Sequence, residues 1–283
     1  MSTATLLISC PDQKGITASV TDFIYANNGN IEHADQHIDS QSNTFFMRIN
    51  WSLAGFRIPK ADIATSFANL ANRFNMKWSL YFDSDLPKVA VFVSRLTHCL
   101  HDLLLKHKQG YFNCRIPLII SNHCEAKDIA KDFKIKFVYL PKTAKNKPEV
   151  EKKELDLLKK EGIELIVLAR YTQIFTRQFV QEFTNRIVNI HHSFLPAFAG
   201  SKPYQRAYGR GVKIIGATSH YVTEELDAGP IIEQDTVRVS HRDSLADLQR
   251  EGEELERAVL SRAVRWHLSR KILIYNNKTV VFD

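Results

Sequence analysis

The chain has 283 residues, of which 44% are hydrophobic and 24% charged, a balance that supports a buried core in one large domain or two ordinary ones. Its net charge of +7 favours anionic ligands, but acidic residues stand among the basic ones, which argues against a nucleic-acid-binding protein. No apolar run is long enough to span a membrane, no secretory signal core opens the chain, and the four cysteines match no metal-binding spacing, so we expect a cytoplasmic protein with no metal site and no membrane partner.

The N-terminal region predicts strands and helices in the order βαββαβ, which is the ferredoxin-like plan. Ile16, Val20 and Ile24 recur at helical spacing, and Asn28-Gly29 suits the left-handed cap that ends a helix. The predicted elements are a strand at 4–9, a helix from 16 to 29, strands at 30–39 and 44–53, a helix at 60–74 and a strand at 76–82.

The stretches PDQKGITASVTDFI, NNGNIEHADQH and FFMRINW resemble the ACT domain, a small regulatory module. The resemblance covers 4–83 and implies that residues 1–84 form a regulatory domain. It implies an amino-acid effector, glycine or methionine, bound near Asp12, Gly15 and Asn30. Because ACT modules usually pair sheets between subunits, it also implies a homo-oligomer, a dimer or a tetramer. The glycines alone are equally well explained as turn residues.

The segment DSDLPK, 83–88, is expected to link this region to a second domain at 85–283. Near-continuous apolar strands joined by helices predict a mostly parallel, Rossmann-like sheet covered on both faces. A long helix should follow a cap at Asp243 or Ser244, and a hairpin should turn at Asn276-Asn277. The predicted strands are 89–93, 116–120, 136–141, 165–169 and 186–190, with helices near 96–104, 123–132, 149–160 and 176–183.

Polar side chains gather where ligands bind in such sheets, beyond the carboxyl ends of the strands. Asn189 and His191 close the strand at 186–190, and Asp227 stands in a sharply turning loop before Gly229-Pro230. An amide N–H can hold a developing oxyanion, and a histidine can protonate a departing nitrogen. A carboxylate favours the imidazolium and can orient a water. The set suits attack on a carbonyl with an amine leaving, and it does not suit phosphoryl transfer.

The stretch NIHHSFLPAF, followed by GATSHYVTEELDAGPIIEQ, resembles the catalytic region of the formyltransferase superfamily that uses formyltetrahydrofolate. The superfamily motif is Asn-x-His, Ser-x-Leu-Pro and, about forty residues later, Asp-x-Gly-Pro. This chain carries it at Asn189, His191, Ser193, Leu195-Pro196 and 227–230. The resemblance covers roughly 88–280 and implies the formyltransferase type of sheet.

In three features the chain resembles the hydrolase branch of that superfamily, the formyltetrahydrofolate deformylases. The ACT-like region comes first, His192 follows His191 where the glycinamide ribonucleotide transferases carry proline, and Ser94-Arg95 replaces a glycine-rich phosphate cradle after the first strand. The resemblance implies hydrolysis of 10-formyltetrahydrofolate to tetrahydrofolate and formate, which supplies purine synthesis and balances one-carbon folate pools. Transfer of the formyl group to an amine is the alternative enzyme hypothesis, and a non-catalytic amino-acid sensor is the alternative from another class.

The resemblance implies a small-molecule folate substrate and no tightly bound cofactor. Thr172 and Phe175 depart from the usual residues of the folate pocket, which leaves its shape open. Lys202 and Tyr204 either touch substrate or cover the site, and His192 more readily supports the site than reacts. We expect His98, His101, His107 and His220 to be solvated or structural. The implied site residues are Asn189, His191 and Asp227 for catalysis, and Tyr171, Gln173, Ile174, Phe175, His192, Ser193 and Glu224 for substrate binding.

Overall fold

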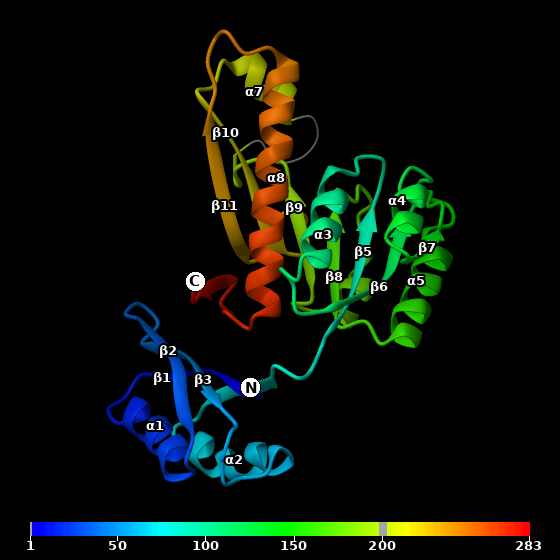
Figure 1. Cartoon of the computed structure of the whole chain (residues 1–283). Helices are drawn as coiled ribbons and strands as arrows, with labels where there is room; N and C mark the ends of the chain where they lie inside the picture. The colour runs from blue at the N-terminus through cyan, green and yellow to red at the C-terminus, as the bar shows by residue number, and fades with distance from the viewer. Residues whose placement is uncertain (1, 198–202) are drawn as a thin grey trace. The chain divides into compact units, whose positions relative to one another are not determined.

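The computed structural model describes residues 2–197 and 203–283. Its internal contacts divide the chain into two compact units, one formed by 1–86 with 270–283 and the other by 87–269 (Figure 1). Among the described residues, no helix combines the length and apolar character needed to cross a bilayer.

The first unit is a four-stranded antiparallel sheet with helices against one face (Figure 1). Its N-terminal elements are β1 (Thr3–Pro11), α1 (Ile16–Ala26), β2 (Asn30–Asp39), β3 (Thr44–Ser52), the short helix η1 (Lys60–Asp62), α2 (Ile63–Arg73) and β4 (Lys77–Phe82). The strand order β2-β3-β1-β4 confirms the ferredoxin-like plan. Ile16, Val20 and Ile24 are fully buried, as their spacing predicted, and pack with the apolar face of the sheet.

The end of the chain also belongs to this first unit, whereas the sequence led us to expect it within a domain at 85–283. Strands β12 (Ile272–Tyr275) and β13 (Lys278–Val281) form the predicted hairpin, with Asn276 and Asn277 in the left-handed conformation. The Tyr275 ring lies 4.5 Å from the Phe46 ring, and its hydroxyl donates to Asp39 at 2.7 Å. These contacts, made late in the chain with residues near its start, account for the difference.

The second unit contains a seven-stranded sheet of order β11-β10-β9-β8-β5-β6-β7. Strands β5 to β9 are mutually parallel, and β10 and β11 add an antiparallel edge, which confirms the mostly parallel sheet. The elements are β5 (Lys88–Val93), α3 (His98–Lys108), β6 (Arg115–Ser121), α4 (Lys127–Asp132), β7 (Lys136–Tyr139), α5 (Lys147–Glu161), β8 (Leu165–Ala169), α6 (Arg177–Glu182), β9 (Ile187–His191), α7 (Pro203–Arg210), β10 (Ile214–Tyr221), β11 (Ile231–Arg238) and α8 (Leu245–Leu268).

Most predicted elements of this unit begin and end close to the observed ones. The helix predicted at 123–132 is shorter and begins at Lys127, because the Ser121 hydroxyl accepts from the His123 N–H and holds a turn before it. The long helix α8 begins after Ser244, whose side chain forms a capping box with Asp247. Along its length α8 packs against β10, β11 and α3 (Figure 1).

The strand order creates the place where a ligand can enter the sheet edge. After β5 the chain builds β6 and β7 on one side, and it then returns to place β8 and β9 on the other side of β5. The loops that leave β5 and β8 therefore diverge, and a crevice opens beyond their carboxyl ends. Ser94 follows β5, Arg170 follows β8, and His191 ends β9 at this same edge.

Candidate active site

A cavity of about 460 Å³ lies at this edge of the second unit. The three residues expected to act together, Asn189, His191 and Asp227, all line it. The alternation of a strand places Asn189 and His191 on the same side of β9, two positions apart. The loop between β10 and β11 brings Asp227, whose φ of 55° is left-handed.

Gly229 lets this loop pass close to β10. A Cβ atom at Gly229 would lie 1.8 Å from the carbonyl oxygen of Tyr221, a contact that no side chain tolerates. The Tyr221 N–H donates to the carbonyl of Pro230 at 2.9 Å, so the loop is fastened to the strand immediately after the glycine. The glycine thus permits the close approach that presents Asp227 to the cavity.

His191 and Asp227 form a direct pair. His191 Nδ1 lies 3.3 Å from Asp227 Oδ2, and both side chains are largely buried. The hydrogen bond from His191 lowers the pKa of Asp227 below its ordinary value, although partial burial opposes this. His191 Nε2 is buried and has no hydrogen-bond partner among the described residues. This atom belongs to a residue that lines the cavity, and its hydrogen-bonding capacity is not used by any described residue.

His220 also lines the cavity, and the sequence analysis did not include it among the site residues, because it expected this histidine to be solvated or structural. Its Nδ1 lies 2.9 Å from the carbonyl oxygen of Tyr221, so Nδ1 carries the proton and donates it. Burial lowers the pKa of His220, which keeps the ring neutral. Its Nε2 therefore accepts from the Asn189 amide at 3.1 Å. The available signal was a histidine in a predicted strand, GATSHY, that carries no other ionisable group besides Tyr221.

The residues expected to bind folate fall into two groups. Tyr171, Gln173, Ile174, Phe175, His192 and Glu224 all line the cavity. Ser193 does not, because its hydroxyl donates to the carbonyl of Ala197 and the residue faces a second cavity of about 230 Å³. Glu224 also pairs with Arg177 at 2.9 Å at the cavity mouth.

A buried ionic cluster supports the segment from Tyr171 to Phe175, which lines the cavity, and no sequence pattern revealed this cluster. Lys142 is fully buried, with Nζ 2.7 Å from Glu154 and 3.8 Å from Glu151. Glu154 accepts from the Tyr171 hydroxyl at 3.2 Å, and Glu151 accepts from the N–H and hydroxyl of Thr176. The segment from Tyr171 to Thr176 is therefore held to α5 at both of its ends.

The Ser94 side chain, in the turn after β5, is hydrogen-bonded to other residues of the protein. The Ser94 hydroxyl donates to Asn122 Oδ1 at 2.7 Å and accepts from the Thr172 N–H at 3.1 Å. The side chain that replaces a glycine-rich turn is therefore already committed to protein partners and is buried.

His192 and Tyr204 lie behind the catalytic residues. The His192 ring is 5.2 Å from the His191 ring and 5.9 Å from the Tyr204 ring. Burial, with the nearby charge of Arg170, lowers the pKa of His192 to about 3, so the ring is neutral near pH 7. Tyr204 is buried and lies outside the lining of the reaction cavity. Lys202 falls outside the described residues.

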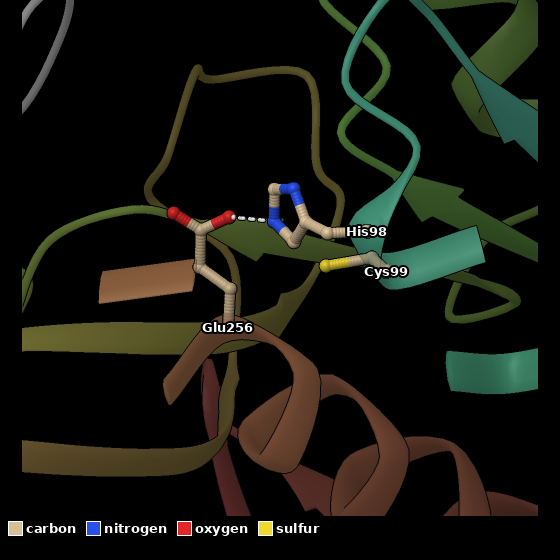
Figure 2. Close-up of side chains that lie close together, drawn as sticks. All are labelled: His98, Cys99 and Glu256. Carbon is tan, nitrogen blue, oxygen red and sulfur yellow. Dashed lines mark hydrogen bonds and ion pairs between the residues drawn. The ribbon is translucent and has the colours of Figure 1, made fainter. Parts of the chain in front are cut away.

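His98, Cys99 and Glu256 lie together where α3 faces α8, and Figure 2 shows the bond between His98 and Glu256. One potential ligand atom from each lies within 4.8 Å of the others. The Glu256 carboxylate is already occupied by donors, and the Arg170 guanidinium lies 3.3 Å from it. A cation placed there would face Arg170, so this chemistry disfavours a metal ion. His98 was expected to be solvated or structural; its side chain is only 10% exposed and is paired with Glu256, which supports the structural alternative.

The first unit carries the residues expected to bind an effector. Gly15 is left-handed at the start of α1, Asp12 donates its N–H to the carbonyl of Asn43, and Asn30 begins β2. An open hollow on this unit is lined by α1 residues and Ile31, and its lining includes none of the three.

Each of the two units matches a known protein family. Residues 87–264 match the family model described as formyl transferase, and residues 4–64 match the ACT domain. The formyltetrahydrofolate deformylase of Synechocystis sp. is 55% identical over 99% of this chain and 98% of that protein. That of Bacillus subtilis is 49% identical over 98% of this chain and 93% of that protein. The crystal structure of a formyltetrahydrofolate deformylase from Pseudomonas syringae has a TM-score of 0.98 and 42% identity, covering 100% of this chain and 95% of that one.

Proposed function

Because the chain belongs to the formyltetrahydrofolate deformylases, a branch of the formyl transferase family, we propose that it hydrolyses 10-formyltetrahydrofolate to tetrahydrofolate and formate. The observation that carries the proposal is the pairing of His191 with Asp227 beside the Asn189 amide in one cavity. Addition of water to a formyl carbon requires a donor for the oxyanion and groups that move protons, and these three side chains supply both.

Asn189 stabilises the oxyanion. One N–H of its amide is held by His220, so the amide nitrogen has a fixed direction and its second N–H is left for the formyl oxygen. As the carbon becomes tetrahedral, negative charge grows on that oxygen, and a fixed donor gains strength without reorganising. Such a donor is worth about 3 kcal/mol of barrier.

His191 and Asp227 move protons. With Nδ1 directed at Asp227, the other ring nitrogen is the atom that exchanges a proton with water or substrate. The lowered pKa keeps Asp227 ionised, so the carboxylate stabilises an imidazolium as it forms. The water oxygen bonds to the formyl carbon, the bond from carbon to N10 breaks, and His191 returns a proton to N10.

Tyr171, Gln173, Ile174, Phe175, His192 and Glu224 are proposed to surround the folate, with the 223–227 backbone along the pterin edge. The buried aromatic rings of Tyr171 and Phe175 are stacked, 5.5 Å apart, and give this side an apolar wall. Ser193 is no longer proposed as a direct contact, because its hydroxyl is used within its own turn.

The test is incubation with 10-formyltetrahydrofolate and no amine. We expect tetrahydrofolate and formate to appear in equal amounts, because water is the acceptor. Formyl loss that occurs only after an amine is added would instead support transfer, the alternative that the family also contains.

The first unit is proposed to regulate turnover by binding an amino acid, and its sheet is proposed to pair with that of a second copy. Titration calorimetry with glycine and methionine tests the first statement, and light scattering tests the second. Absence of heat and of any rate change would reject the effector, and a monomer at working concentration would reject the pairing.

A further inference from the structure

The reaction cavity and the second cavity share one residue, His192. His192 lines the reaction cavity beside His191, and it also lines the second cavity beside Tyr204. The second cavity is otherwise mostly apolar and lies between α7 and β10. The His192 ring is therefore part of a partition that separates the two spaces.

A buried carboxylate fixes the neighbours of this ring. Glu256 on α8 is 1% exposed, and its Oε1 accepts from the Tyr204 hydroxyl at 2.7 Å. Its Oε2 lies 2.7 Å from His98 Nε2, the contact drawn in Figure 2, and 3.3 Å from Arg170 Nε. Arg170 lines the reaction cavity next to His192. Both oxygens of Glu256 are thus used on groups at or behind the partition.

The surface of α8 is shaped for this contact. Gly252 lies one helical turn before Glu256, on the same face. A Cβ atom at Gly252 would lie 2.1 Å from the Tyr204 hydroxyl oxygen. The glycine therefore leaves the space that lets the phenol reach the carboxylate. Burial opposes ionisation of Glu256, but the bond from His98 and the charge of Arg170 hold its pKa below the ordinary value.

We propose that Glu256 is a positioning residue that fixes the partition made by His192, with Arg170 beside it in the reaction cavity, and that this partition restricts the nucleophile at the formyl carbon to water. The inference rests on the proposed function. A cavity of about 460 Å³ has the size of a single-ligand pocket, so a bound folate leaves little room for a second organic reactant. In this proposal an amine would be seated in the second cavity and would reach the formyl carbon across the partition.

Both outcomes balance chemically. When water attacks, a bond from carbon to oxygen forms, the bond from carbon to N10 breaks, N10 gains a proton, and formate leaves. When an amine attacks, a bond from carbon to nitrogen forms, the same bond to N10 breaks, N10 gains the proton that the amine loses, and a formamide leaves. No electrons are exchanged in either case, so the ratio of formamide to formate reports which nucleophile reached the carbon.

The test is product analysis with 10-formyltetrahydrofolate and an excess of glycinamide. Wild type should give formate and no detectable N-formylglycinamide. His192→Ala removes the partition itself, and Glu256→Gln and Tyr204→Phe loosen it. Each should raise the ratio of formamide to formate by about tenfold or more above the uncatalysed background. If Glu256→Gln fails to fold, Tyr204→Phe tests the same contact, because it removes only the hydroxyl that donates to Glu256.

Asp102→Asn is the matched control. Asp102 on α3 also accepts from α8, through Ser261, but it lies outside the lining of both cavities. This variant should keep the wild-type product ratio. Folded variants of Glu256, Tyr204 and His192 that release only formate would overturn the inference and leave the proposed function standing. A wild type that releases no formate in the absence of glycinamide would instead overturn the proposed function, and this inference with it.

Discussion

At the scale of single residues, the direction of two hydrogen bonds decides which atoms face the substrate. His220 donates from Nδ1 to the Tyr221 carbonyl, so its Nε2 accepts and orients the Asn189 amide. His191 points Nδ1 at Asp227, so its Nε2 is left for the reaction. In each ring the proton stays on Nδ1, because an oxygen acceptor faces that nitrogen. The donors for an oxyanion are therefore set before substrate arrives.

The lowered pKa of His192 predicts acid sensitivity. Its value of about 3 in the folded chain lies below the ordinary 6.5, so the unfolded chain binds the proton more tightly. This contribution to stability is present above pH 6.5 and is lost as the pH falls from there towards 3. Between pH 7 and pH 5 the free energy of unfolding should fall by up to about 2 kcal/mol through this one group.

Urea unfolding of wild type and His192→Gln at both pH values measures that contribution. The variant should lose less stability on acidification than wild type does. His101→Gln, a change at an exposed histidine, is the control and should behave as wild type. An equal acid loss in wild type and His192→Gln would contradict the expected role of this ring.

At the scale of elements, the segment between β8 and α6 is held in place by a buried cluster of charged side chains. Lys142 comes from the loop after β7, and Glu151 and Glu154 come from α5. The Lys142 ammonium also lies 4.9 Å from the centre of the Phe175 ring. One buried cation thus stabilises two carboxylates and contacts an aromatic ring of the folate wall.

Lys142→Met should be strongly destabilising, by about 3–5 kcal/mol, because it removes the cation that lies 2.7 Å from the buried Glu154 carboxylate, whereas Glu151 still has Lys147 at 4.0 Å. The KM for the folate substrate should rise more than kcat falls, since the change displaces the binding segment and leaves Asn189 and Asp227 in place. Chemical unfolding and steady-state kinetics measure the two effects.

Lys136→Met is the matched control, since it removes a half-exposed lysine paired with Glu161 at 2.8 Å. A surface pair of this kind is worth at most about 1 kcal/mol. If Lys142→Met cost no more stability than Lys136→Met, the buried cluster would have no supporting role.

The elements that the sequence predicted well are those with local signals. Apolar runs marked the strands of the parallel sheet, and a short motif brought Asn189 and His191 to the end of one of them. The buried charges carried no such signal, because a charged residue is placed inside only by a partner distant in the chain. His98 and Glu256, for example, are 158 positions apart. The same reason explains why His220 was missed, since the Asn189 amide that it orients is 31 positions away.

At the scale of the whole molecule, the chain leaves the first unit after residue 86 and returns to it at 270. The catalytic unit is therefore inserted, in sequence, between the ACT-like strands and the hairpin that packs on them. The guanidinium of Arg270 lies 4.2 Å from the centre of the Tyr81 ring, at the point of return. A domain boundary drawn from strand patterns alone does not reveal such a return.

Tyr275→Ala should weaken the first unit, because it removes the ring that packs on Phe46 and the hydroxyl that donates to Asp39. Hydrogen exchange of the β2 and β3 amides should quicken in this variant and quicken less in Tyr275→Phe, which keeps the ring. Tyr25→Ala is the control, since Tyr25 is 79% exposed. Unchanged exchange in Tyr275→Ala would show that the hairpin does not stabilise the sheet.

The central claim is that Asn189, His191 and Asp227 together add water to a formyl group. The most direct test is the rate of formate release from 10-formyltetrahydrofolate by wild type, Asn189→Ala and Asp227→Asn, each confirmed as folded. Wild type should release one formate per substrate. Asn189→Ala should lower the rate by about 10²–10³-fold because it removes a fixed oxyanion donor, and Asp227→Asn should lower it because it removes the carboxylate that stabilises the imidazolium. A folded Asn189→Ala variant that keeps a rate within about tenfold of wild type would contradict the account, because a fixed oxyanion donor is worth more than that.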